Sequence, residues 1–176
     1  MMMLSRAITR RASQRRDHRE RGAAAVEFAL TLLPLLMIIF GVLHFGFALA
    51  QKASLNSAVR SGARYGSVNI YNSVADPHSC DKTVARAQEG VATLGMTASA
   101  VTFRVYKGAT LAAAQAAGAI CTNSSPNSTP PCDDSDQADS LYVVASYTTN
   151  LVGIPFTGIN RTVLLQSVGA FRCEYS

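Results

Sequence analysis

The stretch AAAVEFALTLLPLLMIIFGVLHFGFALA, residues 23–50, carries ionisable side chains only at Glu27 and His44. From Phe28 to Ala50 it contains 23 residues with His44 as their single ionisable group. At about 1.5 Å per residue a helix of this length spans roughly 34 Å, enough to cross a hydrocarbon core of about 30 Å. The stretch therefore predicts a transmembrane helix. A charge near the bilayer interior costs roughly 3 kcal/mol, so Glu27 requires a specific explanation.

The net positive charge of the chain comes from the residues before this stretch. Residues 1–22 contain seven arginines against Asp17 and Glu20, which gives +5, while residues 23–176 carry nine basic and nine acidic residues. A basic segment directly beside a membrane-length apolar run is typical of the positive-inside rule. We therefore expect a disordered basic leader on the cytoplasmic side (1–22), a transmembrane helix (23–50) and an exported domain (51–176), with no nucleic-acid partner.

The exported domain has the pattern of an α+β fold. Helical composition continues past the membrane through residues 51–68, so one long helix is expected to enter the domain. Apolar spacing, alternation and turn residues predict the remaining elements: a helix over 81–95 ending near Gly95, a strand over 98–107, a short helix within 109–120, a surface loop over 121–140, and strands over 140–150 and 160–174. The expected architecture is this long N-terminal helix packed on a small antiparallel sheet of about three strands.

Small residues recur every four positions where the long helix is expected to leave the membrane, at Ala50, Ser54, Ala58, Gly62 and Gly66. Such a stripe lies on one helix face and permits close approach of another helix or a sheet. Packing within the domain and contact between subunits both remain open as interpretations.

All four cysteines, Cys80, Cys121, Cys132 and Cys173, follow the apolar run. An even number outside the cytoplasm favours disulfides, and four cysteines allow three connectivities. Cys121–Cys132 is the preferred pair because it would close a short loop rich in Pro and Ser, leaving Cys80 with Cys173. The alternative to disulfide bonding is a zinc site that uses His78 and Cys80. No CxxC pair supports such a site, so no metal is predicted.

Several short motifs together identify a family. Gly22 precedes Ala23, and Glu27 and Phe28 would be the fifth and sixth residues if the chain were cut after Gly22. This arrangement resembles the processing site of type IV prepilins. The surrounding residues are similar to the N-terminal signature of the TadE-like proteins of the tight-adherence (Tad/Flp) pilus system. The similarity covers roughly residues 21–66. The features that carry it are Arg21-Gly22, Ala25-Val26-Glu27-Phe28-Ala29, Leu33-Pro34-Leu35-Leu36, Gly41, Phe45-Gly46 and Ala63-Arg64-Tyr65.

The resemblance implies a minor pilin or pseudopilin in the bacterial plasma membrane. A prepilin peptidase would cut after Gly22, and Glu27 would then meet the new amino group at Ala23 of a neighbouring subunit. Further implied partners are other pilins, the Tad membrane platform and the lipid bilayer, with a part in cell adhesion. TadE-like and TadF-like proteins are not distinguished. Within the membrane helix, Pro34 should cause a kink, and His44 lies near the exported end with Gly41 and Gly46 nearby.

Parts of the sequence also fit two other classes of protein. Residues 1–50 could be a secretory signal peptide or signal anchor, because Ala48-Leu49-Ala50 fits the small-x-small cleavage rule. Against this, the apolar core exceeds the usual 7–15 residues and contains Pro34. An enzyme is disfavoured because His78 is the only histidine after residue 50, and no GxSxG, HExxH or Gly-rich phosphate loop is present. The sequence therefore predicts no catalytic residue and no cofactor.

Overall fold

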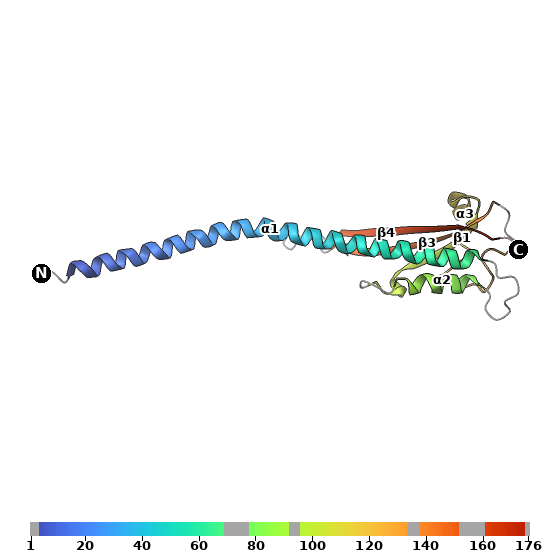
Figure 1. Ribbon diagram of the computed structural model, residues 1–176, viewed down its shortest axis with the longest axis horizontal. Helices are drawn as coiled ribbons and strands as arrows, with labels where there is room; N and C mark the ends of the chain where they lie inside the picture. Colours follow the sequence, from blue (N-terminus) through green and yellow to red (C-terminus); the bar gives the residue numbers. More distant parts are fainter. Residues whose placement is uncertain (1–3, 69–77, 92–95, 134–137, 152–160, 175–176) are drawn as a thin grey trace. The chain divides into compact units, whose positions relative to one another are not determined.

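The computed structural model describes residues 4–68, 78–91, 96–133, 138–151 and 161–174 (Figure 1). The chain forms two compact units, an N-terminal unit of Met1–His44 and a C-terminal unit of Phe45–Ser176. Helix α1 runs from Leu4 to Ser67 and contributes to both. Residues 4–22 thus lie in this helix, where the sequence had led us to expect a disordered leader. That segment is rich in Arg, which favours helix, and it contains neither Pro nor Gly before Gly22.

Within the N-terminal unit, α1 passes through Pro34 without ending. Proline has no N–H, so the carbonyl of Leu30 loses its ordinary helical donor. One turn earlier, Thr31 Oγ1 donates to the carbonyl oxygens of Glu27 at 3.2 Å and Phe28 at 3.0 Å. These bonds satisfy the threonine hydroxyl within the helix, where an apolar surrounding would offer it no other partner.

The C-terminal unit contains a four-stranded sheet in the order β2-β1-β3-β4. Its strands are β1 (Thr102–Gly108), β2 (Cys121–Thr122), β3 (Ser140–Leu151) and β4 (Arg161–Arg172). All neighbouring strands pair antiparallel, with Val105 opposite both Cys121 and Val143, and Val143 opposite Gly169. The two long strands form the main ladder, and β2 extends the sheet by only two residues.

Helices cover both faces of this sheet. Helices α1 and α2 (Cys80–Glu89) lie on one side, and α3 (Leu111–Ala117) lies on the other (Figure 1). The larger core forms between the sheet and the first two helices, and its most deeply buried large side chains are Leu55, Val59, Val91, Val101, Phe103, Val105, Leu141 and Val143. A smaller cluster of Tyr106, Ala114 and Val144 lies under α3.

The α+β fold with a long helix on a small antiparallel sheet is confirmed, with differences at the ends of elements. The strand expected over 98–107 begins only at Thr102, because Ala98–Ala100 form a 3-10 turn. The helix expected over 81–95 ends at Glu89, and Gly95 lies outside the described residues. The region expected as a loop over 121–140 contributes β2, which adds a fourth strand to the expected three.

Gly90 explains the early end of α2. A Cβ at this position would lie 3.0 Å from the Ala58 Cα, so glycine allows the chain to leave α2 against the backbone of α1. Glycine also has low helix propensity, which favours a helix end at this point.

The disulfide pairing preferred from the sequence, Cys121–Cys132 with Cys80–Cys173, is wrong. Cys80 bonds Cys121 and Cys132 bonds Cys173, with Cα–Cα distances of 6.2 and 5.6 Å. Each bridge joins residues 41 positions apart and so closes a large loop, which removes entropy from the unfolded chain. The short loop from Cys121 to Cys132 is not closed by a bridge of its own.

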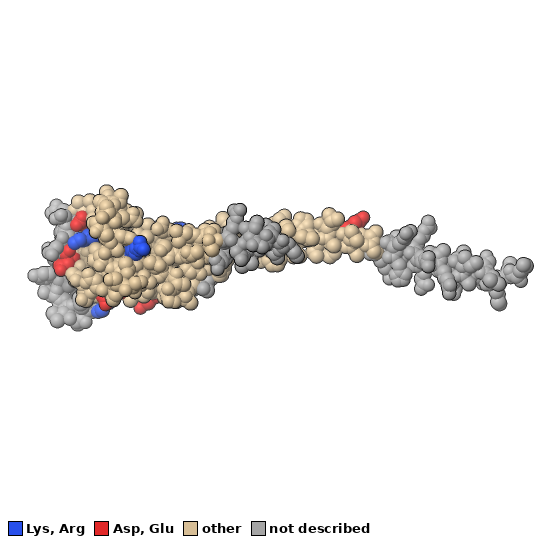
Figure 2. Space-filling model, turned by 180° about the vertical axis from the view of Figure 1, so that it is seen from behind, with Lys and Arg blue, Asp and Glu red and all other residues tan. Residues whose placement is uncertain are grey.

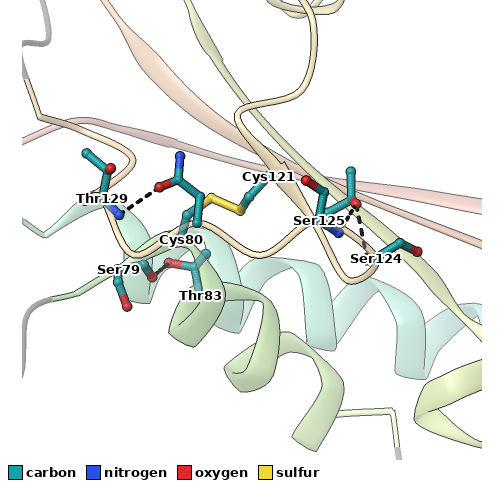
Figure 3. The surroundings of a disulfide bond; sticks show 9 residues. Ser79, Cys80, Thr83, Cys121, Ser124, Ser125 and Thr129 are labelled. Atoms are coloured by element: carbon teal, nitrogen blue, oxygen red, sulfur yellow. Dashed lines mark hydrogen bonds between the residues drawn. A yellow bond between two sulfur atoms is a disulfide. The ribbon is translucent and has the colours of Figure 1, made fainter.

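The start of α2 explains this pairing (Figure 3). Cys80 N donates to the Thr129 carbonyl and Asp81 N to the Asn127 carbonyl, both at 3.0 Å, so the segment after β2 runs beside the helix N-terminus. This places Cys80 next to Cys121 on the sheet edge. Cys132 then continues toward the end of β4, where it meets Cys173. The helix-to-loop hydrogen bonds thus decide the connectivity, and sequence spacing does not reveal them.

Candidate functional site

The predicted processing residues lie on one exposed helical segment of the N-terminal unit. Gly22, Ala23, Glu27 and Phe28 are all exposed on α1. Ala23 and Glu27 are four positions apart, which places them on the same helix face, about 6 Å apart along the axis. A Cβ added at Gly22 would meet no atom within 4 Å. The segment is therefore open to other molecules.

The apolar part of α1 has no protein core around it. Within Gly22–Ser67 an 18-residue window reaches a mean hydropathy of 2.4, and none of that window is buried within the protein. Large apolar side chains are widely exposed, among them Phe28 at 65% and Leu30 at 72%. By length and composition this helix can cross a membrane. Figure 2 shows the described part of this segment as a run of uncharged residues interrupted by one acidic patch.

The remaining membrane-helix residues singled out in the sequence lie along the same helix. Pro34 is exposed and His44 is partly buried. Cβ atoms added at Gly41 or Gly46 would meet nothing within 4 Å. Among the described residues, none therefore packs against Gly41 or Gly46.

The stripe of small residues packs against α2 within the C-terminal unit. A Cβ at Gly62 would lie 2.8 Å from Ala87 Cβ, and one at Gly66 would lie 2.6 Å from Thr83 Oγ1. Ala58 meets Gly90, and Ser54 Oγ donates to the Gly90 carbonyl at 3.2 Å. Of the two interpretations left open by the sequence, packing within the domain describes Ser54 to Gly66. Ala50, at the start of the stripe, is only partly buried.

The four cysteines all lie in disulfides, so Cys80 is not available as a metal ligand beside His78. His78 instead stacks on Tyr65 with ring centroids 4.0 Å apart, and its Nδ1 lies 2.8 Å from the Tyr65 carbonyl oxygen. Among the described residues, no group of three or more His, Cys, Asp and Glu could hold a metal ion.

One feature of the C-terminal unit was missed in the sequence. The exposed side of α1 forms an open groove that carries Arg60 and Arg64, with Arg86 from α2 beside them. The available signal was the polar face opposite the small-residue stripe, formed by Asn56, Ser57, Arg60, Ser61 and Arg64. Positions 56, 60 and 64 follow the same four-residue period as the stripe, which places them on one face.

Comparison with known proteins bears on the segment that begins at Gly22. A family model described as TadE-like protein matches residues 22–64. No curated protein and no solved structure matches the chain. The family and the apolar helix together indicate a membrane-anchored protein associated with Tad pili. The resemblance found in the sequence is thereby confirmed: residues 22–64 of this chain are similar to the TadE-like family.

Proposed function

We propose that this chain is a minor pilin or pseudopilin that takes part in the assembly or function of a Tad-type (Flp) pilus. The observation that carries the proposal is the position of Glu27, the sole carboxylate of an exposed apolar helix, four residues after Ala23. The TadE-like match begins at Gly22, the residue after which we expect the chain to be cut. The role is structural and works through packing rather than catalysis.

In this proposal the chain crosses the bacterial plasma membrane once. The arginines before Gly22 keep the leader in the cytoplasm, and the C-terminal unit is exported. Two disulfides, Cys80–Cys121 and Cys132–Cys173, support an oxidising compartment for the C-terminal unit, because such bonds persist outside the cytoplasm.

Removal of the leader would create the partner that Glu27 needs. Cutting after Gly22 frees an amino group at Ala23 and removes the arginine cluster. Within one subunit, Ala23 and Glu27 are already neighbours on one helix face. Between subunits, the amine of one chain and the carboxylate of the next neutralise each other, which lowers the cost of placing both charges in a medium of low dielectric constant. Glu27 thereby registers this subunit against its neighbour.

The partners follow from these steps. A prepilin peptidase removes the leader, the lipid bilayer stores the subunit through the apolar helix, and other pilins or pseudopilins pair with it. The Tad membrane platform handles its assembly, and attachment of the cell to surfaces is the process it serves.

The test is the N-terminus of the native protein, extracted from membranes of a strain with an active prepilin peptidase and measured by mass spectrometry. We expect a chain that begins at Ala23, and a Gly22→Leu variant that keeps its leader. Gly41→Leu is the matched control, since both glycines lie on α1 with open space around a Cβ. It should be processed normally.

Two results would reject the proposal. A chain beginning at Gln51 would instead identify residues 1–50 as a signal peptide. An intact leader in the presence of active peptidase would identify an unprocessed membrane anchor.

A further inference from the structure

The segment from Thr122 to Pro131 has an unusual composition. It reads TNSSPNSTPP and consists of five Ser or Thr, two Asn and three Pro, without a charged side chain. Every one of these residues belongs to the part of the chain that the structure describes. Sequence rich in Ser, Thr and Pro is found in O-glycosylated segments, and it also occurs in ordinary surface loops. The hydrogen bonds of the segment distinguish these two interpretations.

The first two polar side chains of the segment are used by the fold itself. Thr122 Oγ1 accepts a hydrogen bond from Ser125 N at 3.0 Å and so fixes a turn. Asn123 uses both atoms of its amide: Oδ1 accepts from Phe103 N at 3.2 Å, and Nδ2 donates to the Val101 carbonyl at 3.0 Å. These two side chains therefore have a structural role.

The other four hydroxyl side chains of the segment face the solvent. They belong to Ser124, Ser125, Ser128 and Thr129, all of which are exposed. Within the described part of the chain, the side chains of these four residues form no hydrogen bond. A hydroxyl of this kind is open to an enzyme, and a group attached to it would displace no contact of the fold.

The backbone that carries these hydroxyls is anchored although it lacks the large apolar side chains of a core. Disulfides hold the residues on either side of the segment, Cys121 and Cys132. Between them, the Thr129 carbonyl accepts from Cys80 N at 3.0 Å, which ties the segment to the start of α2 (Figure 3). The fold thus spends two disulfides and several hydrogen bonds on presenting a polar segment at the surface.

We propose that this segment is an O-glycosylation site and that its acceptors are the hydroxyls of Ser124, Ser125, Ser128 and Thr129. The donor is a sugar activated on a lipid-linked pyrophosphate, and a separate glycosyltransferase catalyses the transfer. The side-chain oxygen attacks C1 of the sugar, so an Oγ–C1 bond forms while the bond from C1 to the pyrophosphate oxygen breaks. The leaving pyrophosphate takes the electron pair, and the hydroxyl proton passes to a base of the transferase.

A neutral sugar suits the site better than a phosphate does. Asp81 is exposed at the start of α2, and its backbone N donates to the Asn127 carbonyl, next to Ser128. A phosphate on Ser128 would bring a charge of about −1.5 to −2 towards this carboxylate, and like charges repel. A sugar adds bulk and solubility without charge. The proposal rests on the proposed export of the C-terminal unit, since the lipid-linked donor would meet the segment on that side of the membrane.

Mass spectrometry of the native full chain tests the site. The protein is extracted from its own membranes, and the peptide that contains residues 122–131 is fragmented by electron transfer, which leaves a glycan on its residue. We expect the mass of one or more sugar residues on the four hydroxyl side chains. Replacing all four by alanine should remove the whole of this added mass.

Two control variants show whether the sugar is attached through oxygen at this segment. Ser57→Ala with Ser61→Ala removes two exposed serines of α1 and should leave the added mass unchanged. Asn127→Asp keeps an oxygen for Thr129 N, which donates to Asn127 Oδ1 at 2.9 Å, but it removes the amide nitrogen. The added mass should persist in this variant. Two intact disulfides verify that each variant is folded.

Three outcomes would overturn the proposal: an unmodified segment, a phosphate in place of the sugar, or a sugar attached to Asn127. The N-terminus is measured in the same sample, which keeps the two proposals apart. An unmodified segment in a chain that begins at Ala23 would refute glycosylation without refuting the pilus role. A glycosylated segment in a chain that keeps its leader would do the reverse.

Discussion

Gly169 of β4 lies against the backbone of Val59 on α1, so closely that a Cβ at position 169 would overlap the Val59 carbonyl. This contact fixes how near the long helix approaches the sheet. In the ladder Gly169 lies opposite Val143, which belongs to the buried core.

Gly169→Ala should therefore destabilise the C-terminal unit. Overpacking of this kind typically costs about 1–3 kcal/mol, because helix and sheet must separate. Thermal unfolding of the full chain in detergent, followed by circular dichroism, measures the effect. Gly41→Ala is the control, since its added methyl group meets nothing. An unchanged melting temperature for Gly169→Ala would show that the helix is free to move away from the strand.

The contact between Gly62 and Ala87 predicts a reciprocal pair of variants. Gly62→Ala should destabilise the unit by about 1–3 kcal/mol, because the new Cβ would lie 2.8 Å from Ala87 Cβ. Adding Ala87→Gly should recover part of that loss by removing the opposing methyl group. A double-mutant cycle of unfolding free energies checks the coupling. Additive effects would contradict direct helix–helix packing at this site.

The disulfide pairing predicts which thiol a single substitution releases. Cys80→Ser should leave Cys121 free to react with iodoacetamide, while Cys132 and Cys173 stay protected. Loss of the bridge should cost about 2–5 kcal/mol of stability. Peptide mapping after alkylation gives the answer, with Cys132→Ser as the reciprocal variant that should release Cys173. Labelling of Cys173 in Cys80→Ser would instead indicate a Cys80–Cys173 bridge.

Asp81, in the first turn of α2, predicts a pH effect. A hydrogen bond from the Ser79 side chain lowers the pKa of Asp81 below its ordinary value. Because the folded pKa is depressed, the stabilisation is present above the unfolded value of about 3.9 and is lost as the pH falls through the folded pKa. Asp81→Asn should flatten this acid-side loss in unfolding experiments. Ser79→Ala should move the carboxyl titration, followed by NMR, to higher pH; an unmoved titration would exclude the hydrogen bond as the cause.

Glu27 predicts a separation between insertion and assembly. Glu27→Leu should insert into the membrane as well as the native chain does, because it removes a charge from an apolar helix. Its co-purification with the major pilin should be abolished if Glu27 pairs with a neighbouring amino terminus. Glu89→Gln, which changes an exposed carboxylate on α2, is the control. Unchanged co-purification of Glu27→Leu would exclude this role.

The sequence predicts those features that depend on local periodicity. Alternation along Val101, Phe103 and Val105 correctly indicated their burial, and the α+β class followed from the order of such segments. The ends of elements were harder to predict because they depend on tertiary contacts. Gly90 ends α2 where it meets Ala58, a residue 32 positions away, and no local pattern reveals that approach.

The groove and the disulfides were beyond prediction for the same physical reason. Arg60 and Arg64 are visible as a pair in the sequence, but Arg86 and Phe171 reach them only through folding. Likewise, the hydrogen bond from Cys80 N to the Thr129 carbonyl joins segments 49 residues apart. The segment from Gly22 to Phe28 differs because the residues that carry its resemblance lie close together in the sequence.

One consequence concerns any attempt to prepare the C-terminal unit without its anchor. The final turns of α1 supply Leu55, Val59 and Ala63 to the interior, and Gln51 is already 2% exposed. A fragment that starts after Ser67 would lack one wall of its hydrophobic interior, whereas one that starts just before Gln51 would retain it. The apolar membrane-length segment and the C-terminal unit share helix α1. A soluble truncation must therefore divide that helix, because no linker separates the two.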